Sequence, residues 1–286
     1  MSQRKCVWSS LAAYALLLSI LVSFDGYVEN AEYKDSLLNG IERQNVNFLK
    51  QHAEKGKACF KKIESNSEIV DLNGDGIKDA IRLECKPGGD SFTLYINDQS
   101  AAGGGNNLDG IMFLSNIDSS DKFKEIAITE SGPSSDEATY FYYYDGTNIN
   151  FMGKIQGSQY AIKMTGDGAF TTKTRGEILQ TWFYTDHYKL NSSHNLENIP
   201  QKFYKMNSLV TVTRQLKLQK LPTDSETSII LVPGEDVMIT GCDNKEWCEV
   251  ENAKGLKGWF AVDDFYTMRG ENLNASDYFE GLCYAD

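Results

Sequence analysis

Histidine, proline and cysteine are scarce in this sequence, and the scarcity excludes several kinds of site. The 286 residues include 3 histidines, 5 prolines and 6 cysteines, and no two cysteines have the Cys-x-x-Cys spacing. A thiolate or imidazole zinc site is therefore not expected. The Gly-x-Ser-x-Gly elbow, the His-Glu-x-x-His pair and the Gly-x-x-x-x-Gly-Lys loop are also lacking. A Ser-x-x-Lys match at residues 119–122 is short enough to arise by chance, so we assign no catalytic residue.

Basic residues are also fewer than acidic ones. Lys and Arg number 28 against 40 Asp and Glu, which gives a formal net charge of -12. A nucleic-acid surface would show a basic stripe, so neither nucleic acid nor anionic lipid is an expected partner. An acidic surface suits the binding of cations, although most acidic surfaces only keep a protein soluble.

Long apolar runs are limited to the N-terminus. Arg4 and Lys5 form a short basic start, and residues 6–24 carry no charge. This pattern predicts a signal peptide or an uncleaved signal anchor over residues 1–24. The rest of the chain is then expected outside the cytoplasm, as a secreted, periplasmic or cell-surface protein. Contact with a membrane would come only through an uncleaved anchor.

Cysteine usage fits an exported chain, because disulfides persist outside the cytoplasm. Removal of the signal segment with Cys6 would leave an odd number of cysteines, so at least one is free or pairs with another molecule. The nearest pairs in sequence, Cys59 with Cys85 and Cys242 with Cys248, suggest two structural disulfides and one cysteine left over, although the pairing itself stays open. The five cysteines are Cys59, Cys85, Cys242, Cys248 and Cys283.

The pattern of apolar residues predicts a helix followed by two sets of strands. Residues 33–62 place their apolar side chains roughly on one side of a helix. Residues 63–200 are short apolar runs separated by Gly, Asn or Asp clusters, as in antiparallel meanders. A polar stretch at 191–207 is expected to mark a domain boundary. Residues 208–268 form a second strand set, and 269–286 a tail or a short terminal helix.

An oxygen-rich stretch, VDLNGDGIKDAIRL at residues 70–83, allows either a surface turn or a metal site. Counted from the first Asp, acceptor side chains alternate and converge, and Gly76 permits a sharp bend. The number and hardness of these oxygens suit Ca²⁺ better than Mg²⁺, which keeps its waters. The alternative is an ordinary Asn-Gly and Asp-Gly turn without metal. The predicted ligands are Asp71, Asn73, Asp75, Ile77 through its carbonyl oxygen, and Asp79.

This loop departs from an EF-hand, because Arg82 occupies position twelve and a strand-like run follows. It resembles the D-x-[DN]-x-D-G-x-x-D loops of the FG-GAP or VCBS repeat family. Those repeats belong to extracellular β-propellers, in which the loop joins two strands of a blade and holds calcium. The resemblance implies the same five ligands and a structural calcium ion.

Two weaker echoes of the loop follow along the chain. NIDSSDKFKEIAITE aligns Glu125 with Asp79 and has Asp118 and Asp121 before it, and TGDGAFTTKTRGEI hints at a third copy. The spacing of about 46 residues suits an internal repeat. Three copies are fewer than the four or more blades of a full propeller. The first β-domain is therefore either a partial-propeller arrangement of meanders or a compact sandwich.

Residues 209–266 resemble a bacterial Src-homology-3-like domain, a small β-barrel common in exported wall-associated proteins. The chain departs from the family where LKLQKLP replaces the usual Asn-Val-Arg-x-Gly-Pro, a loop that often lines the ligand groove. The resemblance implies a mostly β chain ending in such a barrel. The matching positions are Leu216 to Leu218, Pro222, Ile229 to Leu231, Gly234, Trp247 and Gly258-Trp259.

Aromatic residues give two candidate ligand surfaces. Trp247 and Trp259 suit either barrel packing or a groove for peptidoglycan stem peptides or glycan. In a strand, Tyr140, Tyr142 and Tyr144 lie on one face, which suits either packing or a sugar-stacking platform.

The sequence thus predicts an exported, non-catalytic calcium-binding β-protein of the bacterial cell envelope that binds wall polymer or a surface protein. One alternative is carbohydrate recognition by exposed aromatics. The other is an envelope hydrolase, because acids are plentiful and a carboxylate pair at hydrolytic spacing is not visible in sequence.

Overall fold

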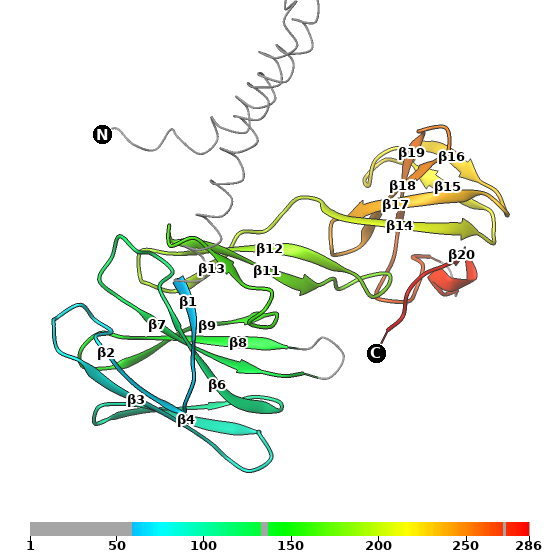
Figure 1. Ribbon diagram of the computed structural model, residues 1–286. Coiled ribbons are helices and arrows are strands. Elements are labelled where there is room, and N and C mark those ends of the chain that lie inside the picture. Colours follow the sequence, from blue (N-terminus) through cyan, green and yellow to red (C-terminus); the bar gives the residue numbers. More distant parts are fainter. Residues whose placement is uncertain (1–58, 133–136, 271–272, 286) are drawn as a thin grey trace, which may run out of the picture. The chain divides into compact units, whose positions relative to one another are not determined.

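The computed structural model describes residues 59–132, 137–270 and 273–285, and within these ranges the protein is built from antiparallel β-sheets (Figure 1). The mostly β prediction is confirmed. The predicted signal segment and residues 33–58 of the predicted helix lie outside the described ranges. Within those ranges, no helix is both long and apolar enough to cross a bilayer. The described residues belong to one compact unit, 55–286.

Three consecutive four-stranded meanders occupy the first two thirds of the described chain, and in each the strands are neighbours in chain order. An extra strand, β1 (Phe60–Ile63), pairs with β6 at the edge of the second meander. The first meander consists of β2 (Ser67–Val70), β3 (Asp79–Cys85), β4 (Ser91–Ile96) and β5 (Gln99–Gly104). The second consists of β6 (Leu108–Ser115), β7 (Glu125–Glu130), β8 (Ala138–Tyr144) and β9 (Ile149–Gln156). The third consists of β10 (Lys163–Met164), β11 (Ala169–Arg175), β12 (Phe183–Leu190) and β13 (Leu196–Asn198).

The second meander is covered on both faces, which explains its unusual sequence. Leu83 and Phe92 of the first meander share a core cluster with Ile128 of β7. On the opposite face, Phe141 of β8 shares another cluster with Phe170 of β11. Every residue of β7 is buried, and so are six of the seven in β8. A strand covered on both sides lacks the alternation of apolar and polar residues, as the aromatic run of β8 illustrates. Face-to-face stacking of meanders is common to a sandwich and to neighbouring propeller blades, and three meanders are too few to close a propeller.

The helix predicted over residues 33–62 does not extend to residue 62, because Phe60–Ile63 form β1. Residues 60–62 are extended, and Phe60 stacks on Phe113 of β6 with ring centroids 4.7 Å apart. Ile63 is buried in the core between the first two meanders. The short FKKI segment has two lysines facing solvent on an edge strand, and its cross-strand packing decides its conformation.

The C-terminal part forms a seven-stranded sheet that curves as a half-barrel, with strand order β16-β15-β19-β18-β17-β14-β20. Its core includes Val237, Val250 and Phe260. A single 3-10 turn, η2 (Ala275–Asp277), precedes its last strand. The strands are β14 (Tyr204–Val212), β15 (Leu216–Gln219), β16 (Thr227–Leu231), β17 (Asp236–Cys242), β18 (Trp247–Asn252), β19 (Lys257–Ala261) and β20 (Phe279–Glu280).

Contacts of the half-barrel extend past both predicted limits of this second module. Residues 269–286, predicted as a tail or a short terminal helix, contain the short 3-10 turn η2 and then β20, which pairs with β14, and Phe279 is buried in the core. The polar stretch 191–207 is not irregular throughout, since it contains β13 and the start of β14. Leu179 and Trp182, which precede the predicted boundary, also pack into the half-barrel core. Polar composition marked the chain's exposed turns, but it did not mark where the core contacts end.

Candidate metal and ligand sites

The three oxygen-rich stretches occupy equivalent places, because each joins the first and second strands of a meander. They also contact one another in series. Lys124 N–H in the second loop donates to the Leu72 carbonyl in the first at 2.8 Å, and Ser119 N–H donates to the Gly166 carbonyl in the third at 3.0 Å. Gly74 has a φ of +70°, and a Cβ there would lie 2.7 Å from Lys122 Cβ. Glycine is therefore required at this contact by conformation and by space.

The first loop is organised by its own acceptor side chains. Asp71 Oδ1 accepts from Gly74 N–H at 2.7 Å, and Oδ2 accepts from Gly76 N–H at 3.0 Å. Asp75 Oδ1 accepts from Ile77 N–H at 2.7 Å. Burial is the largest influence on the pKa of Asp71 and would raise it, but the N–H groups of Gly76 and Gly74 outweigh burial and hold the pKa below its usual value. The loop is thus a preformed turn with an ionised carboxylate.

Two predicted ligands are buried beneath this turn. Asn73 and Asp79 are each 4% exposed. Asp79 Oδ2 accepts from Leu72 N–H at 2.9 Å, while Oδ1 accepts from Asn97 Nδ2 at 2.8 Å. Asp79 therefore fastens the loop to the β4–β5 turn. Each of its oxygens retains a second lone pair, so the hydrogen bonds do not preclude a cation.

The side-chain carboxylates of the loop are not the tightest acidic cluster in the described residues. That cluster, within the described ranges, consists of Asp121, Glu125 and His194. Their ligand atoms all lie within 4.8 Å of one another. A lysine also sits beside the first loop, because Lys124 Nζ donates to the Asp71 carbonyl at 3.2 Å. The predicted five-ligand set is therefore brought into one loop, but its carboxylates are not drawn together as closely as those around His194.

The cluster at the second loop joins residues that are far apart in sequence. His194 Nε2 lies 3.1 Å from Glu125 Oε1, and Nδ1 lies 3.6 Å from Asp121 Oδ2. Glu125 is fully buried, and its other oxygen accepts from Ile117 N–H at 3.1 Å. Burial raises the pKa of Glu125, and the hydrogen bonds from His194 and Ile117 offset this only in part.

The His194 ring is held between two aromatic rings, with centroids 4.9 Å from Phe123 and 4.7 Å from Tyr143. Its two nitrogens face different carboxylates, so in this geometry the imidazole bridges them. The arrangement fastens the β12–β13 turn to the second loop. The sequence indicated Asp121 and Glu125 through the repeat, but it gave no signal for His194, which lies 69 residues beyond Glu125.

The three tyrosines of β8 are packed and do not form an open platform. Tyr140, Tyr142 and Tyr144 are 8%, 5% and 6% exposed. Phe92 meets Tyr140 and Tyr142 edge-on, with centroids 5.8 and 6.0 Å apart. Tyr140 also donates through its hydroxyl to buried Glu130 Oε2 at 2.8 Å. Packing, one of the two interpretations of this strand, is therefore the one the structure supports.

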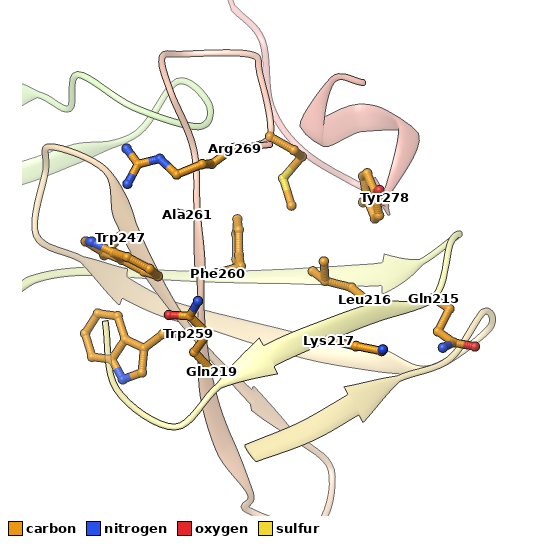
Figure 2. A pocket seen from close by; sticks show the side chains of 11 residues that line it. Gln215, Leu216, Lys217, Gln219, Trp247, Trp259, Phe260, Ala261, Arg269 and Tyr278 are labelled. Carbon is orange, nitrogen blue, oxygen red and sulfur yellow. The ribbon is translucent and has the colours of Figure 1, made fainter. Parts of the chain in front are cut away.

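The two C-terminal tryptophans are brought together on the half-barrel. Trp247 pairs with Ala261 and Trp259 with Glu249, so the indoles project from the same face of adjacent strands. Both line a pocket of about 430 Å³ together with Arg269 and Tyr278 (Figure 2). Arg269 lies over the Trp247 ring at 5.7 Å and bonds to Glu246 and Asp263. The pocket thus offers two indole surfaces beside a neutralised guanidinium group.

Of the two cysteine pairs suggested by sequence, the structure separates one and places the other side by side. Cys59 lies in the core cluster on one face of the second meander, whereas Cys85 packs against the cluster on the opposite face, so the suggested disulfide between them is wrong. Cys242 and Cys248 are direct cross-strand partners on β17 and β18, with both thiols fully buried.

No family model, no curated protein and no solved structure matches this chain. The resemblances to calcium-loop repeats and to bacterial Src-homology-3-like domains therefore rest on the sequence motifs alone.

Proposed function

We propose that this chain is an exported, non-catalytic protein of the bacterial cell envelope whose stacked meanders are braced by calcium in the loop at residues 71–79. The observation that carries the proposal is the placement of this loop. It joins the first two strands of a meander, as in the FG-GAP or VCBS repeats it resembles, and it contacts the equivalent loop of the next meander. A cation there would brace the loop at the point where the first two meanders, which also share a core, contact each other through their loops.

The donor set fits a hard divalent cation. Asp71, Asn73, Asp75 and Asp79 supply only oxygens as acceptors, and Asp71 is held in its charged form by backbone N–H groups. Ca²⁺ accepts six to eight such oxygens in flexible geometry, whereas Mg²⁺ demands a tighter octahedron. Asp71 and Asp75 are the accessible residues of this donor set, so their carboxylates would coordinate the ion from the solvent side. Asp79 and Asn73 would contribute from below.

Lys124 is the competing cation. Its ammonium donates to the Asp71 carbonyl, so a bound calcium ion would meet a positive charge at the rim of the loop. We expect Lys124→Gln to bind calcium more tightly than the natural chain does, because the amide keeps a donor and removes the repulsion.

Thermal melting in calcium, magnesium or chelator tests the metal. At a calcium concentration about 100-fold above its dissociation constant, binding stabilises by about 2.7 kcal/mol, a rise of about 5–10 °C for a chain of this size. Asp75→Ala should lose the rise, and Asp98→Ala, an exposed aspartate in the β4–β5 turn, should keep it. An equal rise in Asp75→Ala, or in magnesium, would contradict the proposal.

Association with the envelope is tested separately by co-sedimentation with purified cell wall. The half-barrel, which resembles wall-associated Src-homology-3-like domains, supplies the expected contact. Retention on wall by the natural chain and its loss in Trp259→Ala would support the proposal, with Phe151→Ala as an exposed aromatic control on another sheet. Failure to sediment would remove the envelope assignment and leave the calcium proposal standing.

Carbohydrate recognition is a second candidate function, favoured by the pocket between Trp247 and Trp259. Sugars stack on indole faces, and Arg269 and Gln219 in the lining offer planar hydrogen-bonding groups. A glycan array probed with the natural chain and with Trp247→Ala separates this function from binding to a wall protein. Binding to isolated glycans that Trp247→Ala abolishes would favour the carbohydrate function.

A further inference from the structure

Among the described residues, Cys242 and Cys248 are the two cysteines that strand register places directly opposite each other. Cys242 ends β17, Cys248 is the second residue of β18, and the two are direct partners in the antiparallel ladder. Each is fully buried, and the side chains are hydrogen-bonded to each other. Both are thiols in the structure.

The local hydrogen-bond pattern fixes the geometry of this pair. Asp243 N–H donates to the Trp247 carbonyl at 3.0 Å, so the adjacent pair toward the hairpin tip is a hydrogen-bonded one. Because hydrogen-bonded and non-hydrogen-bonded pairs alternate, Cys242 and Cys248 occupy a non-hydrogen-bonded site, where Cα atoms lie about 4.5 Å apart. That separation falls within the range of about 4.4–6.8 Å that a disulfide spans without backbone movement.

We propose that Cys242 and Cys248 are joined by a disulfide when the chain folds in an oxidising environment, and that this bond braces the wall of the tryptophan pocket. Each thiol loses a proton and the pair loses two electrons. A small-molecule or protein disulfide of the glutathione type accepts them and is released as two thiols. The inference does not depend on calcium or on any wall ligand.

The timing of oxidation follows from the surroundings of the pair. Burial raises the pKa of Cys248 well above its usual value, and the hydrogen bond with Cys242 raises it further. Thiol–disulfide exchange needs a thiolate and an open approach, and the folded hairpin provides neither. The bond therefore forms during folding and, once formed, is protected from reductant in the folded protein.

The bond would act on the pocket through the hairpin between the two cysteines. Asp243 Oδ1 accepts from the N–H groups of Lys245, Glu246 and Trp247, so the tip is already ordered around one carboxylate. Trp247 lines the pocket, and Glu246 is paired with Arg269, another residue of the lining. A covalent link beside the turn limits the separation of these residues when the strands open.

Peptide mapping of the full chain tests the proposal. The natural chain is unfolded in reductant, refolded in a glutathione redox buffer, alkylated in denaturant and cut with trypsin. Cleavage after Lys245 places the two cysteines on different peptides, 221–245 and 246–254. We expect the two peptides to remain joined until reductant is added. The refolded chain should melt about 5 °C above its reduced form.

Cys283→Ala provides the control, because its thiol is exposed and lies outside the hairpin. The joined peptides should persist in this variant. Recovery of both peptides singly and alkylated, or linkage of either cysteine to Cys59, Cys85 or Cys283, would overturn the proposal. Folded, reduced protein placed in the same buffer should oxidise at least about tenfold more slowly than refolding protein, since the thiols are buried.

Discussion

Buried ionisable side chains are concentrated at the two ends of β7. Glu125 begins the strand and is bonded to His194, while Glu130 ends it and accepts from Tyr140 and from Lys154 Nζ at 2.9 Å. A buried carboxylate is tolerated only when it is paired and hydrogen-bonded. These two glutamates therefore fasten neighbouring loops and strands to the middle meander from opposite ends.

Removal of the imidazole should be costly. His194→Ala leaves the fully buried Glu125 with only the N–H of Ile117 as a partner and opens a gap between Phe123 and Tyr143. We expect a loss of about 2–4 kcal/mol in the free energy of unfolding, measured by denaturant titration. The matched variant His187→Ala, on the exposed side of β12, should change stability by less than about 0.5 kcal/mol. Similar losses in the two variants would show that the bridge contributes nothing.

The same glutamate predicts a pH dependence. Burial raises the pKa of Glu125 in the folded state, so the folded chain holds this proton more tightly than the unfolded chain does. Its contribution to stability is then complete below the unfolded pKa and is lost as pH rises through the folded pKa. With His194 and Asp121 left in place, Glu125→Gln should remove this decline. Denaturant titrations between about pH 4 and pH 7 check it, and parallel curves for the two chains would count against the assignment.

At the scale of elements, the strands that could be predicted are those whose own sequence carries a clear pattern. Strands whose conformation is set by a neighbouring strand could not be predicted. The alternation in DAIRLEC matches β3, where residues are buried and exposed in turn. The Asp145-Gly146 dipeptide, a common hairpin-turn sequence, forms the turn between β8 and β9, since Asp145 Oδ1 accepts from Thr147 and Asn148 N–H and Gly146 has a φ of +99°. Residues 60–62 were predicted to be helical, and β20 in the C-terminal segment was not predicted, because both strands are short. Their conformation comes from the strand beside them, β6 or β14, and not from their own sequence.

The last strand should matter for stability in proportion to its burial. Phe279 of β20 is 1% exposed and packs on Phe260 with ring centroids 5.3 Å apart. We expect Phe279→Ala to lower the free energy of unfolding by about 3–5 kcal/mol, as for other buried phenylalanines. Tyr266→Ala, which removes a ring that is 53% exposed in the preceding turn, should cost far less. Equal costs would mean that the segment after residue 268 is a tail after all.

Over the described chain, whether a candidate site could be predicted depends on how far apart in sequence its contacting residues are. The loop at 71–79 was predictable, because its acceptors fall within nine consecutive residues and bond to its own backbone. The shared face of Trp247 and Trp259 depends on strand register, and sequence alone left it open. The bridge from His194 to Glu125 was out of reach, because nothing in the polar turn that carries His194 indicates which loop it meets.

The limits of the C-terminal module show the same effect on a larger scale and lead to the last prediction. Its core takes Ile178, Leu179 and Trp182 from the segment before β12, and Trp182 Nε1 donates to the Ile178 carbonyl at 3.0 Å. A fragment of residues 204–286 keeps all seven strands but leaves the place of these three side chains open to water. Their burial is worth about 2 kcal/mol each, so the fragment should lose several kcal/mol of stability.

Hydrogen exchange measures this loss directly, because the slowest amides report global opening. The slowest amides of β17 and β18 should exchange at least about 100-fold faster in the fragment than in the full chain, with each tenfold change corresponding to about 1.4 kcal/mol. Equal protection would place the boundary where sequence composition placed it. If protection is lost in this fragment and regained when the fragment begins at residue 176, the half-barrel is completed by a segment outside its own strands.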